Sequence, residues 1–241
     1  MILEEDFKIE LKDIGKENYI KNRAILEIFE NIGTHHSDLA GYGPMDIQKT
    51  GVSWVLLDWK IKILKRPKYG QTVHVRTWGN IKKKAYTYRD FEMYDNENNL
   101  CVIGTSKWVL IDIKTGRITR ITDEIYQKYE LEDKKVFEED ELQKLEIPTE
   151  YTSEIKYQIC RRDIDINNHM HNLYYLDLAY EALPQEVYEK RPFDNVRIEY
   201  LKELKYGYKI TCKYTYFDGK NIVTIFNTDE PEKVHAIIEL F

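Results

Sequence analysis

The chain contains an internal repeat. Residues 58–70 read DWKIKILKRPKYG, and residues 195–207 read NVRIEYLKELKYG. Six of the 13 aligned positions are identical, and the offset between the copies is constant, 207 − 70 = 137 residues. A sequence that repeats itself at a fixed spacing indicates tandem units that share one fold. Any fold proposed for this chain must therefore contain two similar halves.

The sequence around each copy predicts the same order of elements. Apolar residues recur at helical spacing in residues 22–32, NRAILEIFENI, and along one stripe of residues 172–182, NLYYLDLAYEA. Each of these segments opens on an asparagine, a residue that often caps a helix, and Pro184 follows the second. Alternating apolar and polar segments follow each copy, and turn-forming residues separate them. This pattern predicts antiparallel strands.

We therefore expect an α+β fold with two tandem domains, each an antiparallel sheet wrapped around one long central helix. The N-terminal domain is predicted to cover residues 1–135 and the C-terminal domain residues 151–241. Residues 121–150 are highly charged and are expected to be helical or irregular. Residues 136–150 are the predicted linker.

Composition narrows the classes of function. The 241 residues are 42% hydrophobic and 32% charged, as in ordinary globular proteins. The net charge of −6 gives no electrostatic basis for nucleic-acid binding. No apolar run approaches the roughly 18–20 residues that a membrane span needs, and the acidic start MILEEDFKIE is unlike a secretory signal. The three widely spaced cysteines (Cys101, Cys160 and Cys212) favour reduced thiols, so we expect a cytoplasmic protein.

Polar residues alternate in the stretch CRRDIDINNHMHN that precedes the second predicted helix. They are Asp163, Asp165, Asn167, His169 and His171, which an extended chain would place on one face beside the helix N-terminus. Free backbone N–H groups there suit a developing oxyanion, so the set fits a hydrolytic site. Two other interpretations remain open. The residues could be turn and cap formers, or the histidines and an aspartate could bind zinc or iron.

The stretch DIDINNHMHNLYYLDLAYEALP resembles the D-x-N-x-H segment and following helix of the plant and bacterial acyl-ACP thioesterases. The resemblance implies that Asp165, Asn167 and His169 are catalytic. IEYLKEL resembles the next motif of that family and places its catalytic glutamate at Glu203. The family's cysteine position is Leu204 here, so any activity must depend on carboxylate, amide and imidazole groups. The family's fold is a double hotdog, and its reaction releases a free fatty acid from acyl carrier protein without a cofactor.

The two halves are not equivalent. Glu203 aligns with Arg66, and the first half lacks a D-x-N-x-H before its helix, with His35-His36 as its nearest counterpart. The resemblance implies that the first half holds the acyl chain and the second carries out catalysis. The candidate residues that line an acyl site are Trp54, Leu56, Trp59 and Trp108, each of which core packing would also explain.

Three alternatives share much of this pattern: an acyl-CoA thioesterase, a non-catalytic acyl-binding protein and a hotdog dehydratase. The expected partner is an acidic acyl carrier protein, for which Lys82–Lys84 or Lys202 with Lys205 could form a basic docking surface. The lysine run could equally be an ordinary solvated turn. A double hotdog already pairs two sheets internally, so we expect a monomer or a homodimer.

Overall fold

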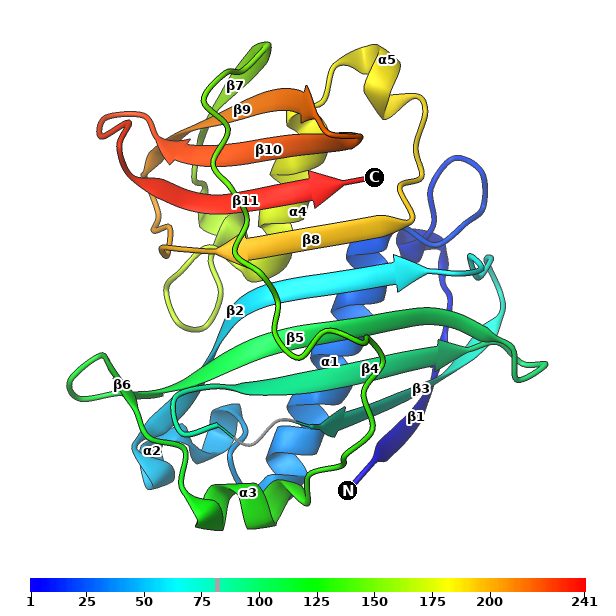
Figure 1. Cartoon of the computed structure of the whole chain (residues 1–241), viewed down its shortest axis with the longest axis vertical. Coiled ribbons are helices and arrows are strands. Elements are labelled where there is room, and N and C mark those ends of the chain that lie inside the picture. The colour runs from blue at the N-terminus through cyan, green and yellow to red at the C-terminus, as the bar shows by residue number, and fades with distance from the viewer. Residues whose placement is uncertain (81–82) are drawn as a thin grey trace. The chain divides into compact units, whose positions relative to one another are not determined.

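A computed structural model describes residues 1–80 and 83–241. The chain divides into two compact units, Met1–Leu142 and Gln143–Phe241 (Figure 1). The predicted linker, residues 136–150, spans the boundary between them. No helix among the described residues is long and apolar enough to cross a membrane.

The first unit is an antiparallel sheet packed against a long helix (Figure 1). Its strands lie in the order β1-β3-β4-β5-β2, with β6 paired to β5. Their bounds are β1 Leu3–Lys8, β2 Val52–Ile63, β3 Thr72–Gly79, β4 Thr87–Tyr94, β5 Leu100–Asp112 and β6 Arg117–Thr119. The helices are α1 Asn22–Ala40, α2 Ile47–Thr50 and α3 Asp123–Tyr129, and two 3-10 turns are η1 Leu11–Asp13 and η2 Pro44–Asp46.

Close contact between helix and sheet explains how the first unit builds its core. Phe29 on α1 stacks on Phe91 of β4, with ring centroids 4.7 Å apart, and Trp59 of β2 lies 5.2 Å from Phe91. Gly104 on β5 permits this approach, because a Cβ atom there would lie 2.7 Å from the Phe29 ring and 3.2 Å from Ile61. All of these apolar side chains are almost fully buried.

The second unit repeats this topology. Its strands lie in the order β8-β11-β10-β9-β7, which matches β2-β5-β4-β3-β1 of the first unit position by position. Their bounds are β7 Ser153–Gln158, β8 Asn195–Tyr200, β9 Lys209–Phe217, β10 Lys220–Asn227 and β11 Val234–Leu240. The helices are α4 Asn172–Ala182 and α5 Gln185–Tyr188, and a 3-10 turn, η3, covers Arg161–Asp163. The predicted pair of helices, each followed by an antiparallel meander, is confirmed.

Two details differ from the sequence-based expectation. The asparagines are the first residues of their helices, while Lys21 and His171 occupy the cap positions. The charged segment after residue 121 is not simply a connection, because α3 packs into the first unit through Ile125, Tyr126 and Tyr129. After α3 the chain crosses the face of the sheet opposite α1 (Figure 1).

Candidate active site

The D-x-N-x-H stretch forms a tight loop, so the predicted extended conformation is wrong. Ile164 and Met170 form an antiparallel bridge that closes the loop, and the Asp165 N–H donates to the His169 carbonyl at 2.8 Å. Asn168 takes the left-handed conformation at φ 60°, which asparagine tolerates better than most residues. The five alternating polar residues therefore do not share one face.

Asp165 organises this loop. Its Oδ1 atom accepts the backbone N–H groups of Asn167 at 2.8 Å and His169 at 3.2 Å. The Asn167 side-chain amide lies 3.4 Å from the second carboxylate oxygen. A carboxylate that accepts two backbone N–H groups fixes the turn, and thereby the direction of the His169 side chain.

Asp163 and His171 take part in local structure instead. Asp163 is 4% exposed and accepts hydrogen bonds from the Cys160 N–H at 2.7 Å and the Tyr157 hydroxyl at 2.9 Å. His171 caps α4, because its Nδ1 atom accepts the Leu173 N–H at 3.3 Å. Within the described residues no group of three or more His, Cys, Asp or Glu side chains is arranged to hold a metal ion.

The structure brings His169 and Glu203 together from two loops. The His169 Nε2 atom lies 3.2 Å from the Glu203 Oε2 atom, and the two side chains are 33% and 54% exposed. Lys205 lies 3.0 Å from the other carboxylate oxygen of Glu203. The loops are joined behind the pair, where the Met170 N–H donates to the carbonyl of the buried Leu204 at 2.8 Å. An imidazole beside a carboxylate, both open to solvent, can remove a proton from water.

Two buried side chains support these loops and were missed in the sequence. Tyr175 on α4 packs edge-on against Tyr200 of β8, with ring centroids 5.2 Å apart. Burial raises the pKa of Tyr175, and the nearby Glu203 and Asp165 carboxylates raise it further. His235 on β11 donates from Nδ1 to the Lys202 carbonyl at 3.2 Å. Only tertiary contacts reveal either role, since neither residue belongs to a motif.

The first unit contains a second copy of the loop, at an offset of 163 − 13 = 150 residues. Ile14 and Ile20 form the equivalent bridge, and Asn18 has the same left-handed conformation at φ 62°. The Gly15 N–H donates to the Tyr19 carbonyl at 2.9 Å. The prediction that His35-His36 is the counterpart of D-x-N-x-H is therefore wrong.

The chemistry of the two copies differs at each functional position. Gly15, Glu17 and Tyr19 occupy the positions of Asp165, Asn167 and His169. Arg66 occupies the position of Glu203 and donates to the Ile20 carbonyl at 3.0 Å. The first unit thus keeps the loop without an imidazole–carboxylate pair.

The two histidines singled out in the first unit have other roles. His36 is buried, and its Nδ1 atom accepts a hydrogen bond at 2.6 Å from the buried Arg89. Burial lowers the pKa of His36 to about 3, and the Arg89 charge acts in the same direction. Burial also lowers the pKa of Arg89 to about 10. His35 is exposed and lies 2.8 Å from Glu5.

The four predicted acyl-lining residues all project from the face of the first sheet that packs against α1. Leu56 and Trp108 are paired across β2 and β5, as are Trp54 and Leu110. A bulge between Leu56 and Asp58 brings Trp59 onto the same face. Trp59 is fully buried beside Phe29, whereas Trp54 is partly buried and donates to the Tyr129 hydroxyl at 2.8 Å. Their role in acyl binding stays a prediction.

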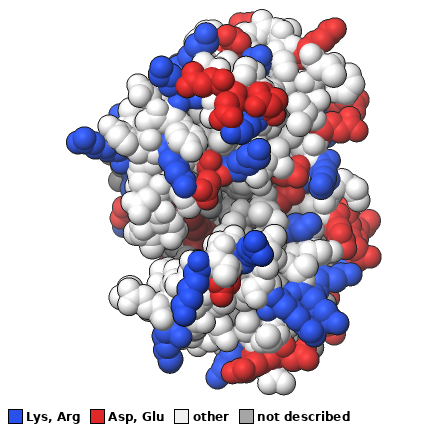
Figure 2. All heavy atoms as spheres, turned by 90° about the vertical axis from the view of Figure 1, so that its left-hand side faces the viewer, with Lys and Arg blue, Asp and Glu red and all other residues white. Residues whose placement is uncertain are grey.

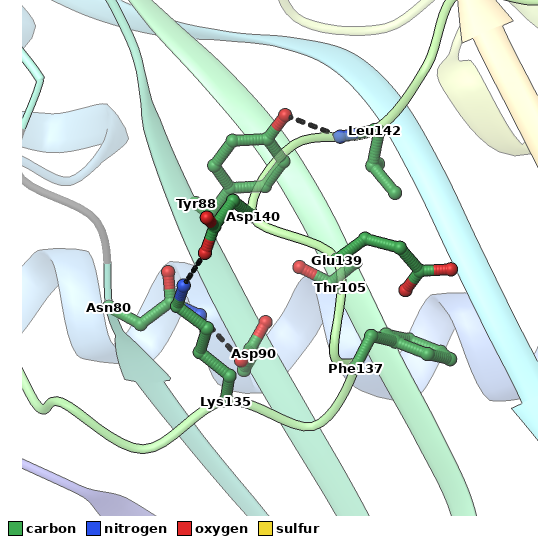
Figure 3. A pocket seen from close by; sticks show the side chains of 9 residues that line it. All are labelled: Asn80, Tyr88, Asp90, Thr105, Lys135, Phe137, Glu139, Asp140 and Leu142. Atoms are coloured by element: carbon green, nitrogen blue, oxygen red, sulfur yellow. Dashed lines mark hydrogen bonds and ion pairs between the residues drawn. The ribbon is translucent and has the colours of Figure 1, made fainter.

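A small pocket lies on the opposite face of this sheet (Figure 3). Its lining includes Tyr88 and Asp90 of β4 and Lys135 and Phe137 of the segment that crosses the sheet. Burial raises the pKa of Asp90 to about 6, opposed by hydrogen bonds from Thr105, the Val136 N–H and Asn80. The Leu142 N–H donates to the Tyr88 hydroxyl at 3.0 Å. These bonds anchor the crossing segment to the sheet, and none of the predicted site residues lines the pocket.

Comparison with known proteins identifies a family whose two domain models match the two halves of this chain. The acyl-ACP thioesterase N-terminal domain family matches residues 2–129, and the acyl-ACP thioesterase C-terminal domain family matches residues 146–237. The chain belongs to the acyl-ACP thioesterase family. Oleoyl-acyl carrier protein thioesterase 1 of Arabidopsis thaliana, a chloroplastic protein, is 25% identical over 216 residues. That match covers 83% of this chain and 59% of the relative, so the chain spans less than two thirds of its length.

Solved structures of the family share the fold. The 12:0-ACP thioesterase from Umbellularia californica superposes with a TM-score of 0.88 at 19% identity, over 99% of this chain and 96% of that one. An acyl-ACP thioesterase from Bacteroides thetaiotaomicron gives a TM-score of 0.88 at 17% identity, over 100% and 97% of the two chains. The predicted α+β fold of two tandem hotdogs is thereby confirmed.

Proposed function

We propose that this acyl-ACP thioesterase family member hydrolyses the thioester of acyl-acyl carrier protein and releases a free fatty acid. The observation that carries the proposal is the His169–Glu203 pair, 3.2 Å apart, on a D-x-N-x-H loop. A thioester carbonyl is already electrophilic, so the enzyme needs an activated water and a donor for the oxyanion. Both histidine and glutamate are open enough to meet a water molecule.

In the proposed reaction a water molecule attacks the carbonyl carbon and loses a proton to His169 or Glu203. The carbon–sulfur bond then breaks, and the leaving thiolate takes up a proton to become the carrier thiol. If His169 takes the proton, the Glu203 carboxylate 3.2 Å away can stabilise the imidazolium that forms. Lys205 pairs with the opposite oxygen of Glu203 at 3.0 Å.

Asn167 and Asp165 have supporting roles in this proposal. The Asn167 side chain is exposed on the loop, where its amide can position the water or the substrate carbonyl. Asp165 holds the N–H groups of Asn167 and His169, so it orients the two residues that meet the substrate. Leu204 takes no chemical part and is buried beneath the loop.

The acyl chain is proposed to bind the helix-facing side of the first sheet. The four predicted lining side chains there are apolar or aromatic, as a hydrocarbon tail requires. Trp54 and Trp108 are only partly buried, so their surfaces are the ones available to a ligand. Leu56 and Trp59 lie deeper and contribute the wall behind them.

The carrier protein is acidic, so its docking depends on local basic groups. Figure 2 shows lysine and arginine side chains interspersed with acidic ones on the face drawn. Lys82 lies outside the described residues. Lys83 and Lys84 are exposed, although Lys83 lies 3.8 Å from Glu141. Reversing the charges of Lys83 and Lys84 is expected to raise KM for acyl-ACP more than for acyl-CoA, and equal effects on both would remove them from the docking surface.

The test is thiol release from acyl-ACPs with chains of about eight to eighteen carbons, measured beside acyl-CoAs of the same chains. Release that favours the carrier protein and peaks at one length supports the proposal. Preference for CoA esters would make the chain an acyl-CoA thioesterase. Binding without release would indicate an acyl-binding protein, and loss of water from a hydroxyacyl substrate would indicate a dehydratase. A cytoplasmic location and a monomer or homodimer remain predictions.

A further inference from the structure

The loop that carries Glu203 is attached to one residue of a neighbouring strand. The Leu201 and Lys202 N–H groups both donate to the His235 carbonyl, at 2.8 and 3.2 Å. The His235 ring completes the attachment, because its Nδ1 atom lies 3.2 Å from the Lys202 carbonyl. A carbonyl can only accept, so Nδ1 carries the proton and donates. Lys202 is thus held at both its N–H and its C=O, one residue before Glu203.

The His235 side chain is buried where it meets the loop. It is 3% exposed, and the Tyr208 ring lies edge-on to it at 6.4 Å. Its Nε2 atom is buried and makes no hydrogen bond with the residues that the structure describes. Burial lowers the pKa of His235, opposed by backbone hydrogen bonds at Lys202 and Glu203. Burial thus favours the neutral ring, which donates from Nδ1 to the Lys202 carbonyl.

The first unit provides an internal comparison. There the Leu64 and Lys65 N–H groups both donate to the Cys101 carbonyl, at 2.8 and 3.1 Å, so Cys101 occupies the position of His235. The Cys101 thiol lies 3.4 Å from the carbonyl of Asn99, in the turn just before β5, instead of bonding to the loop. The backbone attachment is common to both units. The side-chain donor is present only where the loop carries Glu203 instead of Arg66.

We propose that His235 is a positioning residue that fixes Glu203 against His169 through its hydrogen bond to the Lys202 carbonyl. The inference rests on the proposed function, in which Glu203 acts at the reacting centre. Its physical basis is that catalysis by a carboxylate depends on sub-ångström placement. A displacement of about 1 Å can reduce turnover by roughly 10²-fold. The backbone bonds alone keep the loop closed, as they do around Cys101, but leave the Lys202 carbonyl free to rotate.

The experiment compares His235→Leu, which fills the space without a donor, with His235→Asn, whose side-chain amide can replace the Nδ1 donor. Cys101→Ala is the matched control at the equivalent position. Ile237→Ala is a control for lost packing on the same strand, since Ile237 lies in a separate apolar cluster with Ile222 and Val234. We measure kcat and KM for one acyl-ACP, the thermal midpoint, and amide hydrogen exchange of residues 199–206.

We expect His235→Leu to lower kcat by about 10- to 100-fold with KM nearly unchanged, and to speed exchange in residues 199–206. His235→Asn should restore kcat and slow exchange, while both control variants keep the wild-type kcat. Wild-type kcat in His235→Leu, or an Asn variant no better than the Leu variant, would overturn the inference.

Failure of the proposed function gives a different result. If the wild-type protein releases no thiol, amide hydrogen exchange alone tests whether the His235 ring holds the loop that carries Glu203. Faster exchange of residues 199–206 in His235→Leu, restored in His235→Asn, would support the attachment by the ring. Equal exchange in all variants would overturn it.

Discussion

Replacing Asp163 by alanine is predicted to lower stability more than activity, and replacing Asp165 by alanine is predicted to lower activity more than stability. Asp163 has an equivalent in the first unit, because Asp13 accepts the Glu10 N–H at 2.8 Å just as Asp163 accepts the Cys160 N–H at 2.7 Å. Asp165 has none, because Gly15 stands at that position and the loop still closes. The repeat thus separates a structural carboxylate, kept in both units, from one that only the second unit uses.

The magnitudes follow from burial and hydrogen-bond count. Asp163→Ala removes a 4%-exposed acceptor of two hydrogen bonds, one from a backbone N–H and one from Tyr157. Hydrogen bonds to a charged group contribute about 1.5–3 kcal/mol each, so we expect a loss of about 3–6 kcal/mol. For a chain of this size that lowers the thermal midpoint by about 6–24 °C. Asp165→Ala removes two backbone hydrogen bonds and one long side-chain bond to a half-exposed carboxylate, and we expect about 1–2 kcal/mol and a shift of a few degrees.

The loss of activity should be larger in Asp165→Ala than in Asp163→Ala, the reverse of the loss of stability. Asp165→Ala is expected to lower kcat for acyl-ACP by about 10- to 100-fold at a temperature where it is fully folded, because His169 and Asn167 lose their orientation. Asp13→Ala is the matched control for Asp163→Ala and should be destabilised less, by about 1.5–3 kcal/mol, because Asp13 accepts the Glu10 N–H and Phe7 stands where Tyr157 donates to Asp163. The assays are calorimetry and thiol release below the lowest midpoint. A midpoint drop in Asp165→Ala as large as that in Asp163→Ala, with kcat unchanged, would refute this reasoning.

The remaining predictions concern pH, charge and packing in the first unit. His36 is held neutral by a pKa near 3, so its contribution to stability is present above pH 6.5 and lost as the pH falls toward 3. Relative to His36→Gln, the wild type should lose up to about 5 kcal/mol over that range, measured by urea unfolding, and parallel curves would contradict it. The contribution of Asp90 to stability depends on pH in the opposite direction. With its pKa raised to about 6, its contribution is present below pH 4 and lost as the pH rises through 6, by up to about 3 kcal/mol relative to Asp90→Asn. Gly104→Ala should cost about 1–3 kcal/mol because the added methyl meets Phe29 at 2.7 Å, and an unchanged midpoint would show that the ring moves freely.

Local pattern was sufficient to predict the elements of the fold. The repeat, the helical spacing before each copy and the alternation after it predicted α1, α4 and the strands that follow them. The boundaries were less accurate. The α1 helix runs to Ala40, beyond the predicted residue 32, because its last turns pack against α3, a contact that local sequence does not encode.

The second copy of the catalytic loop shows why one part of the repeat was missed. The loops lie 150 residues apart, whereas the motifs after the helices lie 137 apart. Eight of the 13 extra residues lie in α1, which has 19 residues against 11 in α4. A search at one fixed offset therefore loses the alignment of Asp13 with Asp163, and none of the functional residues is identical between the copies.

The site itself was predictable only in part. The contact of His169 with Glu203 joins residues 34 positions apart and follows from the motif that the resemblance supplied, not from spacing. Alternation predicted an extended strand, but the chain turns at Asn168, which has a left-handed conformation, and Asp163 is buried at the end of the 3-10 turn η3. The contact of His235 with Lys202 joins β11 to a loop before β9, and only the strand pairing of the folded unit creates it.

The most direct test of the account is thiol release from a single acyl-ACP by the wild-type protein and by Glu203→Gln and His169→Ala. If the pair activates water, each variant should keep the wild-type thermal midpoint within a few degrees and lose about 10²- to 10⁴-fold in kcat. Wild-type turnover in either variant would contradict the assignment of that residue. Absence of release by the wild-type protein itself, on carrier-bound chains of every length, would contradict the proposed reaction.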